Sequence, residues 1–432
     1  MDSGHKEREK VVQAVCKSMA WLTDLYLVDF FVDDVWSTAV PSSWRCLQDL
    51  PAEEWSLVLD ERVERLPRVV PLALLCLRQL LRHFSLANAD ANEMLTSIGT
   101  SSKEKKRGEI ERAVPLVAAI TDLAGASSFV DVGAGLGHLT RAIALSLPLL
   151  RVRAVEADSA LVHRASELDV KRDGGEVERL RAWVDDSTSH SIVDPNESGV
   201  CVGGLHACGD LSPAILRLAT ASPNVSACVL FGCCYHRLNG GQDRRFRQKW
   251  EGTSSLSTST GFPMSAQFSS SSLSYAAREL ACHNKFYFQT QLSDNKGPSP
   301  LHQGRRALVE WLIAKTGGRR HLGLRGGGSE EEGWKEHFDR ALIDHPEERA
   351  HLLKMLEEDE ELDSILSSRL ASSLGMLRAL CCTRVMVAPF VEDLLLFDRL
   401  AFLREKGFTS SSVIPIFDPS ASPRCFAIVG LR

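Results

Sequence analysis

The pattern of hydrophobic and polar positions is clearest in the first third of the chain, where an apolar run meets a glycine turn. Residues 129–132 are apolar apart from Asp131, which predicts a buried strand with an acid near its C-terminal end. Three glycines follow at every second position: Gly133, Gly135 and Gly137. Residues 139–147 are then apolar and rich in helix formers, which predicts a helix directly after the turn. Such a turn allows a ligand to approach closely, because glycine has no Cβ atom and tolerates positive φ.

The spacing of these glycines distinguishes two kinds of ligand. A dinucleotide fingerprint needs G-x-G-x-x-G, so that a pyrophosphate rests on the helix N-terminus. The chain instead has G-x-G-x-G preceded by Asp131, which resembles the cofactor loop of class I S-adenosylmethionine methyltransferases. In that class the glycines admit the amino-acid part of the cofactor, and the acid holds its ammonium group. The alternative is a glycine turn without a ligand, since short glycine motifs recur by accident.

The next hydrophobic runs predict two neighbouring strands that end on acids. Residues 151–156 alternate apolar and polar side chains, which predicts a strand that ends on Glu156. This acid lies about 20 residues beyond the glycines, at the spacing where the neighbouring parallel strand of a nucleotide-binding sheet places an acid against ribose hydroxyls. Residues 181–186 predict a third short strand that ends on Asp185 and Asp186, either of which is a candidate acceptor for an adenine amine. Ligands of open α/β sheets lie outside the carboxyl ends of the strands, so these acids and the glycine turn support one another.

Two later blocks place histidines and cysteines at strand ends. Residues 200–205 predict a fourth strand and residues 227–231 a fifth. The candidate catalytic side chains follow these strands: His206, Cys208, Asp210, Cys234 and His236. Methyl transfer is an in-line displacement, so the enzyme aligns its substrates and supplies a base where the nucleophile must lose a proton. The two histidines are the candidate bases because imidazole titrates near neutrality, and the aspartate is a candidate to orient one of them.

The same blocks raise the question of a metal site, since Cys208, Cys233 and Cys234 lie near two histidines. Neither type of ligand shows the usual C-x₂₋₄-C or H-x₃₋₅-H spacing of zinc sites. We therefore predict no metal ion, and we expect these thiols to be small buried side chains near the strand ends.

The chain exceeds one typical domain, and its hydrophobic pattern predicts two. Apolar residues recur at three- and four-residue steps near the start, which predicts an N-terminal helical domain over residues 1–109. The predicted α/β domain covers residues 110–432, with an insertion at about residues 240–375 that contains Ser/Thr- and Gly-rich segments.

The C-terminal part of the α/β domain predicts a helix and a closing hairpin. Residues 383–389 are expected to be strand-like or a short connector, followed by an amphipathic helix over residues 391–406. Residues 413–417 and 425–431 predict two final strands. In class I methyltransferases the last two strands form a hairpin, with the final strand antiparallel in an otherwise parallel sheet, and the chain is expected to end in this way.

Composition changes this picture little. The chain has 44% hydrophobic and 25% charged residues, which is ordinary for a folded protein, and its net charge of -6 argues against nucleic-acid binding by bulk charge. Local basic runs at residues 103–107 and 244–249 could still form a stripe, although a solvated face is the simpler interpretation. Twelve cysteines without a C-x-x-C pair or a secretory segment favour free thiols and a cytoplasmic or nuclear, soluble protein. The most apolar run, residues 69–81, contains Arg78 and is too short to span a bilayer.

Several multi-residue blocks resemble the methyltransferase-like protein 25 family, specifically its 25B branch, also called ribosomal RNA adenine dimethylase domain-containing protein 1. They are residues 130–138, 204–210, 233–236, 261–265, 396–400 and 417–424, with Lys105 and Lys106 before the domain. The similarity covers nearly the whole chain. It implies an α/β class I, Rossmann-like methyltransferase fold with a seven-stranded sheet and S-adenosyl-L-methionine as the cofactor, and it leaves the substrate open.

Two comparisons of motifs bear on the substrate. The segments His206-Ala-Cys-Gly and Cys233-Cys-Tyr-His are similar to His-x-Cys-Gly and Cys-Cys-His-His segments of a tRNA 2'-O-methyltransferase family, which favours RNA, either tRNA or rRNA. Adenine dimethylases carry an Asn-Leu-Pro-Tyr type of segment after the fourth strand, where this chain has residues 205–210 without such an Asn, Pro or aromatic residue. A hydroxyl or another nucleophile that needs a base fits these residues better.

Three hypotheses follow from the sequence. The first is an S-adenosylmethionine-dependent methyltransferase that acts on RNA, with protein or a small molecule as the next choice of substrate. The second is a catalytically idle methyltransferase fold that serves as a binding or scaffold protein. The third is a nicotinamide-dependent oxidoreductase, which the spacing of the glycine loop disfavours.

Overall fold

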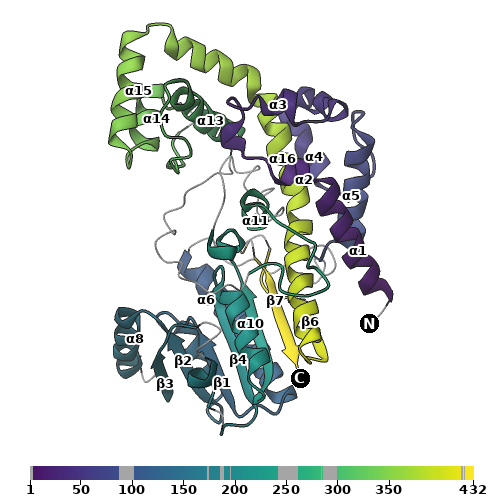
Figure 1. Ribbon diagram of the computed structural model, residues 1–432, viewed down its shortest axis with the longest axis vertical. Helices are drawn as coiled ribbons and strands as arrows, with labels where there is room; N and C mark the ends of the chain where they lie inside the picture. Colours follow the sequence, from purple (N-terminus) through teal and green to yellow (C-terminus); the bar gives the residue numbers. More distant parts are fainter. Residues whose placement is uncertain are drawn as a thin grey trace.

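The centre of the molecule is a seven-stranded sheet with strand order β3-β2-β1-β4-β5-β7-β6 (Figure 1). The computed structural model describes residues 3–86, 102–172, 175–184, 189–194, 196–241, 261–283, 285, 299–329, 331–419, 422 and 424–432. The strands are β1 Ser128–Val132, β2 Arg151–Glu156, β3 Val177–Arg181, β4 Val200–Ala207, β5 Val225–Gly232, β6 Ser410–Pro415 and β7 Phe426–Leu431. Strands β1 to β5 pair in parallel, and β7 pairs antiparallel with both β5 and β6. This confirms the predicted α/β Rossmann-like sheet of the class I methyltransferase type with its closing hairpin.

The register of the central strands brings three predicted site segments to one edge of the sheet. Val132 pairs with Val155 of β2, and Asp131 pairs with Gly203 of β4. All five residues of β1 are buried, as expected for a parallel strand that is covered on both faces. The glycine turn after β1 therefore lies between the carboxyl ends of β2 and β4.

Helices cover this sheet and follow the strands that the sequence predicts. They are α6 Ser102–Leu123, α7 His138–Ser146, α8 Ser159–Arg172, α9 Ser189–Ile192 and α10 Leu211–Ala221. Helices α7 and α8 pack on β2 and β3, α10 packs on β4 and β5, and α6 contacts α7 and β5. The predicted helix after the glycine turn is confirmed in α7, whose N-cap residue is Gly137.

Most N-terminal helices pack along one long helix rather than around a separate centre (Figure 1). They are α1 Ser3–Ser18, α2 Ala20–Thr23, η1 Leu27–Asp29, α3 Val35–Thr38, η2 Ser42–Asp49, η3 Ala52–Glu54, α4 Trp55–Leu59 and α5 Leu72–Phe84. The long helix is α16, Leu362–Glu405. Buried side chains continue from these helices through α16 into the sheet. The predicted domain boundary after residue 109 stays a prediction.

The predicted insertion contains further helices, and part of it has a hydrophobic cluster of its own. The elements after β5 are η5 Tyr235–Gly241, α11 Tyr275–Leu280, α13 Pro300–Lys315, α14 Trp334–Ala341 and α15 Pro346–Glu358. Side chains of α13, α14, α15 and the first turns of α16 form a second buried cluster that includes Leu312, Phe338, Leu352 and Leu366. In Figure 1, α16 runs from this cluster down to the sheet. The helix is therefore continuous across residue 375, where the insertion was predicted to end.

Two predicted elements differ from the structure. Residues 383–389 are not strand-like or a connector, because they lie inside the 44-residue helix α16. Nearly every residue of this part of α16 is buried, so its sequence lacks the one-sided apolar pattern that marks a surface helix, and Pro389 within it suggested an end. The third strand, β3, covers residues 177–181 rather than the predicted residues 181–186. It ends at Arg181 because that residue pairs with Glu156, the last residue of its partner β2.

Candidate active site

The glycine turn after β1 has the backbone conformation that its spacing predicts. Gly133, Gly135 and Gly137 have φ values of +73°, +54° and +72°. A Cβ atom on Gly133 would lie 2.7 Å from Leu211 Cδ2, and one on Gly137 would lie 2.5 Å from Arg179 Nη2. A Cβ atom on Gly135 would meet nothing within 4 Å. The outer glycines are therefore needed for packing, whereas Gly135 faces open space where a ligand has room to approach.

Glu156 lies directly against this turn at the end of β2. Its Oε2 accepts the backbone N–H of Gly135 at 2.9 Å, and its Oε1 accepts that of Asp158 at 3.0 Å. The carboxylate is half-buried and keeps free lone pairs, because each carboxylate oxygen can accept two hydrogen bonds. The predicted neighbourhood of Glu156 and the glycines is confirmed, and its role toward ribose stays a prediction.

The carboxyl group of Asp131 is buried rather than exposed to solvent. Its side chain is 2% exposed, and its Oδ2 accepts the hydroxyl of Thr140 at 2.6 Å. Burial raises the pKa of this carboxyl to about 6, which the Thr140 hydrogen bond only partly offsets. Asp131 thus supports the turn from below, and its predicted contact with a ligand ammonium group stays a prediction. Asp185 and Asp186, the predicted adenine partners, lie outside the described residues.

A buried charge cluster supports the glycine turn from its other side. Asp169 of α8 accepts hydrogen bonds from Arg179 Nε at 2.6 Å and from Arg141 Nη1 at 2.9 Å. Burial opposes its charge, yet the hydrogen bonds from Arg179 and Arg141 hold the pKa of Asp169 below its ordinary value. Arg141 also donates to the carbonyl of Leu136 within the turn, at 2.7 Å. The sequence analysis missed this cluster, because its members lie on three separate elements.

His206 stands at an irregularity of β4, beside the glycine turn. The strand shifts register between Leu205 and Ala207, and His206 has a φ of +60°, which is uncommon for a residue with a Cβ atom. Its side chain is 44% exposed, and its Nε2 lies 3.0 Å from Oε2 of Glu109. Glu109 is buried in α6, and its other oxygen accepts the hydroxyl of Ser422 at 2.9 Å. A buried carboxylate therefore orients an exposed imidazole.

Glu109 lies against the His206 imidazole, and the orienting role that the sequence analysis gave to Asp210 stays a prediction. The Oδ1 atom of Asp210 accepts the backbone N–H of Asn239 at 2.9 Å. The side-chain oxygen of Asn239 in turn accepts the N–H groups of Gly261 and Phe262 at 2.6 and 3.1 Å. Asp210 thus holds η5 and the segment after residue 260 in place. The contact between Glu109 and His206 joins residues 97 positions apart, and no spacing in the sequence signals it.

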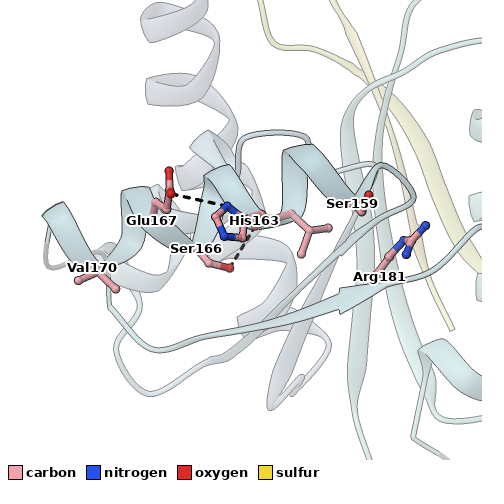
Figure 2. A pocket seen from close by; sticks show the side chains of 7 residues that line it. Ser159, His163, Ser166, Glu167, Val170 and Arg181 are labelled. Carbon is pink, nitrogen blue, oxygen red and sulfur yellow. Dashed lines mark hydrogen bonds and ion pairs between the residues drawn. The ribbon is translucent and has the colours of Figure 1, made fainter.

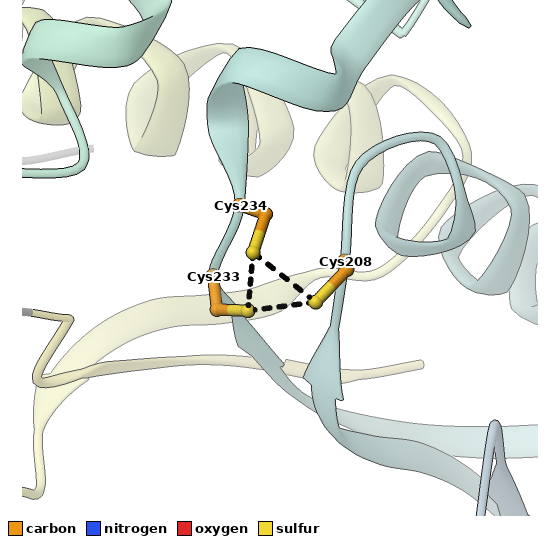
Figure 3. Close-up of side chains that lie close together, drawn as sticks. All are labelled: Cys208, Cys233 and Cys234. Atoms are coloured by element: carbon orange, nitrogen blue, oxygen red, sulfur yellow. Dashed lines mark hydrogen bonds between the residues drawn. The ribbon is translucent and has the colours of Figure 1, made fainter. Parts of the chain in front are cut away.

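Three cysteine thiols converge where β4 and β5 end. Cys208 follows β4, and Cys233 and Cys234 follow β5; Figure 3 shows their sulfur atoms facing one another across the gap between the two strand ends. The Sγ atom of Cys208 lies 3.0 Å from that of Cys233 and 3.3 Å from that of Cys234, and the adjacent pair is 3.4 Å apart. Hydrogen bonds from the other two thiols lower the pKa of the Cys234 thiol, which favours its thiolate form.

His236 lies on η5, close to the cysteines but with a partner different from that of His206. Its Nδ1 is 3.5 Å from the Sγ atom of Cys282, and its ring meets the Tyr275 ring edge-on with centroids 6.3 Å apart. Burial lowers the pKa of His236, so its imidazole is neutral at pH 7. The structure thus gives the two candidate bases separate surroundings, one beside a carboxylate and one beside a thiol.

Two segments far apart in the sequence meet close to this edge. Asp398 of α16 accepts the backbone N–H groups of Met264 and Ser265 and the hydroxyl of Ser265, at 2.8 to 2.9 Å for the shortest contact of each. Arg424 donates to the carbonyl of Cys282 at 3.0 Å. The Asp398 bonds thus join the blocks at residues 261–265 and 396–400, whereas Arg424 joins the block at residues 417–424 to Cys282, the neighbour of His236.

A shallow groove of about 570 Å³ runs along α8 at the β3 edge of the sheet (Figure 2). Its lining residues are Ser159, Val162, His163, Ser166, Glu167, Val170 and Arg181. None of the glycines, histidines or cysteines of the candidate site lines it, and the His163 and Glu167 side chains are 79% and 54% exposed. The groove therefore contains neither the glycine turn nor the candidate bases, although its Arg181 pairs with Glu156 at the end of β2.

Comparison with known proteins agrees with this geometry. Residues 105–241 match a family model described as a methyltransferase domain. A Mus musculus protein named probable methyltransferase-like protein 25 is 27% identical over 299 residues, covering 65% of this chain and 46% of that protein. Its Homo sapiens counterpart is 27% identical over 264 residues, covering 57% of this chain and 39% of that protein. The chain thus matches less than half the length of these curated relatives.

Solved structures add little to this assignment. An S-adenosylmethionine-dependent methyltransferase from Clostridium acetobutylicum is 13% identical, covers 30% of this chain and 52% of its own, and has a TM-score of 0.23. The assignment therefore rests on the strand order, the glycine turn and the family model, which together indicate a methyltransferase domain of class I, a class whose expected cofactor is S-adenosylmethionine. The open space over Gly135 and the adjacent Glu156 carboxylate fit this cofactor.

No described helix is long and apolar enough to cross a membrane.

Proposed function

We propose that this protein is an S-adenosylmethionine-dependent methyltransferase that acts on RNA, at a nucleophile which loses its proton to His206. The observation that carries the proposal is the pair of His206 and Glu109 at the carboxyl end of β4, beside the glycine turn. The proposal includes membership of the 25B branch of the methyltransferase-like protein 25 family and a cytoplasmic or nuclear location.

The cofactor side of the proposal assigns roles at the ends of β1 and β2. The glycine turn and Asp131 would receive the amino-acid part of the cofactor, Glu156 would accept hydrogen bonds from its ribose, and Asp185 or Asp186 would accept one from its adenine. When bound, S-adenosylmethionine supplies an electrophilic methyl group on a sulfonium sulfur. The open space over Gly135 and the position of Glu156 beside it support this assignment.

The acceptor side assigns the base to His206 and its orientation to Glu109. A carboxylate that accepts the proton of Nε2–H leaves Nδ1 with a lone pair, so the exposed imidazole can take a proton from a substrate hydroxyl. The positive φ of His206 is the kind of local strain that persists where surrounding structure holds a side chain in a functional position. His236, Cys208 and Cys234 complete the proposed acceptor side, with Asp210 fixing the adjacent η5 element.

RNA is the proposed acceptor because of the residues around this base. The His206-Ala-Cys-Gly and Cys233-Cys-Tyr-His segments lie together at the ends of β4 and β5, and both are similar to segments of a tRNA 2'-O-methyltransferase family. A ribose hydroxyl needs a base such as His206, whereas an adenine amine needs the Asn-Leu-Pro-Tyr type of segment that residues 205–210 lack.

The test is methyl transfer from S-adenosylmethionine with a tritiated methyl group to separate pools of RNA, protein and small molecules, with the full chain as the enzyme. We expect label in RNA, lost in His206→Ala and kept in His163→Ala, an exposed histidine on α8. Label in protein or in small molecules instead would overturn the RNA assignment. Cofactor binding without label in any pool would favour a binding or scaffold protein.

A further inference from the structure

The three cysteines at the ends of β4 and β5 differ from the other buried cysteines in how their sulfur atoms are placed. Cys201, Cys228 and Cys425 are buried like ordinary small apolar side chains. In contrast, the sulfur atoms of Cys208, Cys233 and Cys234 form a triangle with sides of 3.0, 3.3 and 3.4 Å (Figure 3). These sides far exceed the S–S bond length of about 2.05 Å, so the thiols are close but not cross-linked.

We propose that Cys208, Cys233 and Cys234 bind one zinc ion at the carboxyl ends of β4 and β5. Thiolates that bind tetrahedral zinc at about 2.3 Å lie roughly 3.8 Å from one another, so the observed triangle needs to open by less than about 1 Å. Sulfur ligands select zinc over magnesium and calcium, which prefer oxygen. Three protein ligands leave the fourth position of a tetrahedral ion open, as in catalytic zinc sites.

The usual spacing of zinc ligands does not reveal this site, because its cysteines come from two different strand ends. The C-x₂₋₄-C rule describes ligands from one short turn, where two residues must separate the cysteines. Here one ligand follows β4 and two follow β5, and these strands are hydrogen-bonded neighbours in the sheet. The sheet, rather than the local sequence, brings Cys208 to the adjacent pair 25 and 26 positions away. An ion here would link two strand ends at the acceptor side of the site, apart from the glycine turn.

The described part of the chain offers one other group of potential ligands, and it is less suited to a metal. Asp29, Glu310 and His321 lie close together, but Arg320 Nη2 already lies 2.6 Å from Asp29 and His321 Nε2 lies 2.7 Å from it. The arginine charge balances these acids without an ion. The charge of Arg424 also acts on the Cys233 and Cys234 thiols, but the triangle offers three sulfur ligands, which suit zinc, and it is the stronger candidate.

The first test measures metal in the full chain, purified under reducing conditions with zinc in the medium. Mass spectrometry of bound metals should find about one zinc ion per chain, and a strong chelator should lower the melting temperature. The metal-free, reduced protein should then bind Co²⁺ and show the sulfur-to-cobalt charge-transfer band and the strong visible bands of a tetrahedral thiolate site. This readout uses the native sequence, so it does not depend on whether a variant folds.

Variants then locate the ion. Cys208→Ser and Cys234→Ser should each lose the cobalt spectrum, whereas two controls should keep it. One control is the double variant Cys381→Ala with Cys382→Ala, an adjacent buried pair on α16, and the other is the exposed Cys76→Ser on α5. The proposal is overturned if the reduced native protein shows no thiolate bands with Co²⁺, or if the zinc content persists in Cys208→Ser and Cys234→Ser.

A redox alternative is tested in the same samples. Peptide mass spectrometry without reductant would reveal a disulfide between Cys208 and either neighbour, and a stoichiometric disulfide in protein that takes up no zinc after reduction would overturn the proposal. The zinc site lies on the proposed acceptor side, but its metal content is measured without any assay of methyl transfer. Thermal shift with S-adenosylmethionine on each sample measures the cofactor site separately, so failure of one proposal leaves the other intact.

Discussion

The two halves of the candidate site are built in different ways. At the ends of β1 and β2 the contacts are local, since the Glu156 carboxylate meets the Gly135 N–H only 21 positions away. At the ends of β4 and β5 they are distant, since Glu109 reaches His206 across 97 positions and Ser422 across 313. The first half rests on backbone conformation and on side chains less than 40 positions apart, and the second on side chains that elements far apart in the sequence bring together.

This difference decides how each half responds to substitution. A half built on backbone conformation fails when a glycine is replaced, because other residues rarely adopt its positive φ and would bring a Cβ atom into the space for a ligand. A half built on side chains fails one function at a time, so that a base, its orienting carboxylate or a thiol can be removed while the cofactor still binds. Substitutions in the first half should therefore abolish cofactor binding, whereas substitutions in the second half should lower methyl transfer and leave cofactor binding intact.

The largest effect is expected from Gly135→Arg, which fills the open space over the glycine turn. The native protein should be stabilised by S-adenosylmethionine and its demethylated product but not by NAD, by about 2.7 kcal/mol at 100 times the dissociation constant. The variant should lose this stabilisation completely in a thermal-shift measurement. Gly317→Arg is the matched control, because Gly317 has a φ of +70° and equally open surroundings. Equal loss in the control, or a response of the native protein to NAD alone, would contradict the assignment.

The second prediction concerns substitutions that should affect methyl transfer but not cofactor binding. His206→Ala should lower the rate of methyl transfer by about 10² to 10⁴-fold, the usual contribution of a general base, without weakening cofactor binding. Glu109→Gln should lower the rate less, because a neutral amide holds the imidazole in place less firmly than the carboxylate does. Glu111→Gln, whose exposed side chain pairs with Arg107, should change neither quantity. Full activity in both His206→Ala and His236→Ala would rule out histidine as the base.

Much of the fold was predictable from the sequence for a physical reason. The strands before the glycine turn and around Val200–Ala207 are buried on both faces, so their composition alone marks them. The helical state of residues 383–389 was not predictable, because burial on all sides of α16 removes the periodicity that distinguishes a helix from a strand. In the site, Glu156 and the glycines follow from spacing, whereas Glu109, the Arg179 cluster and the cysteine triangle depend on tertiary contacts.

A third prediction concerns pH and Asp131. Its pKa rises from the ordinary 3.8 to about 6 on folding, so the folded state holds the proton more tightly. Its contribution to stability is therefore full below pH 3.8 and is lost as the pH rises through about 6, to a total of about 3 kcal/mol. Asp131→Asn should be more stable than the native protein at pH 8 in urea unfolding, with the difference closing near pH 4, while its affinity for S-adenosylmethionine falls. The exposed Asp49→Asn is the control. A less stable Asp131→Asn at pH 8 would contradict the prediction.

The smallest effect tests whether the distant contacts behind the acceptor half contribute to stability. Ser265 donates its hydroxyl to the buried Asp398 at 2.8 Å, and its oxygen accepts the N–H of Phe268 at 3.3 Å. Ser265→Ala removes both bonds but leaves two backbone N–H groups on Asp398, so the free energy of unfolding should fall by about 1 to 2 kcal/mol. Cofactor binding should stay unchanged, because the glycine turn shares none of these bonds. Ser270→Ala, at an exposed position of the same segment, should cost nothing measurable. If Ser265→Ala weakens cofactor binding as much as it weakens stability, the two halves are coupled through α16 and the division between them fails.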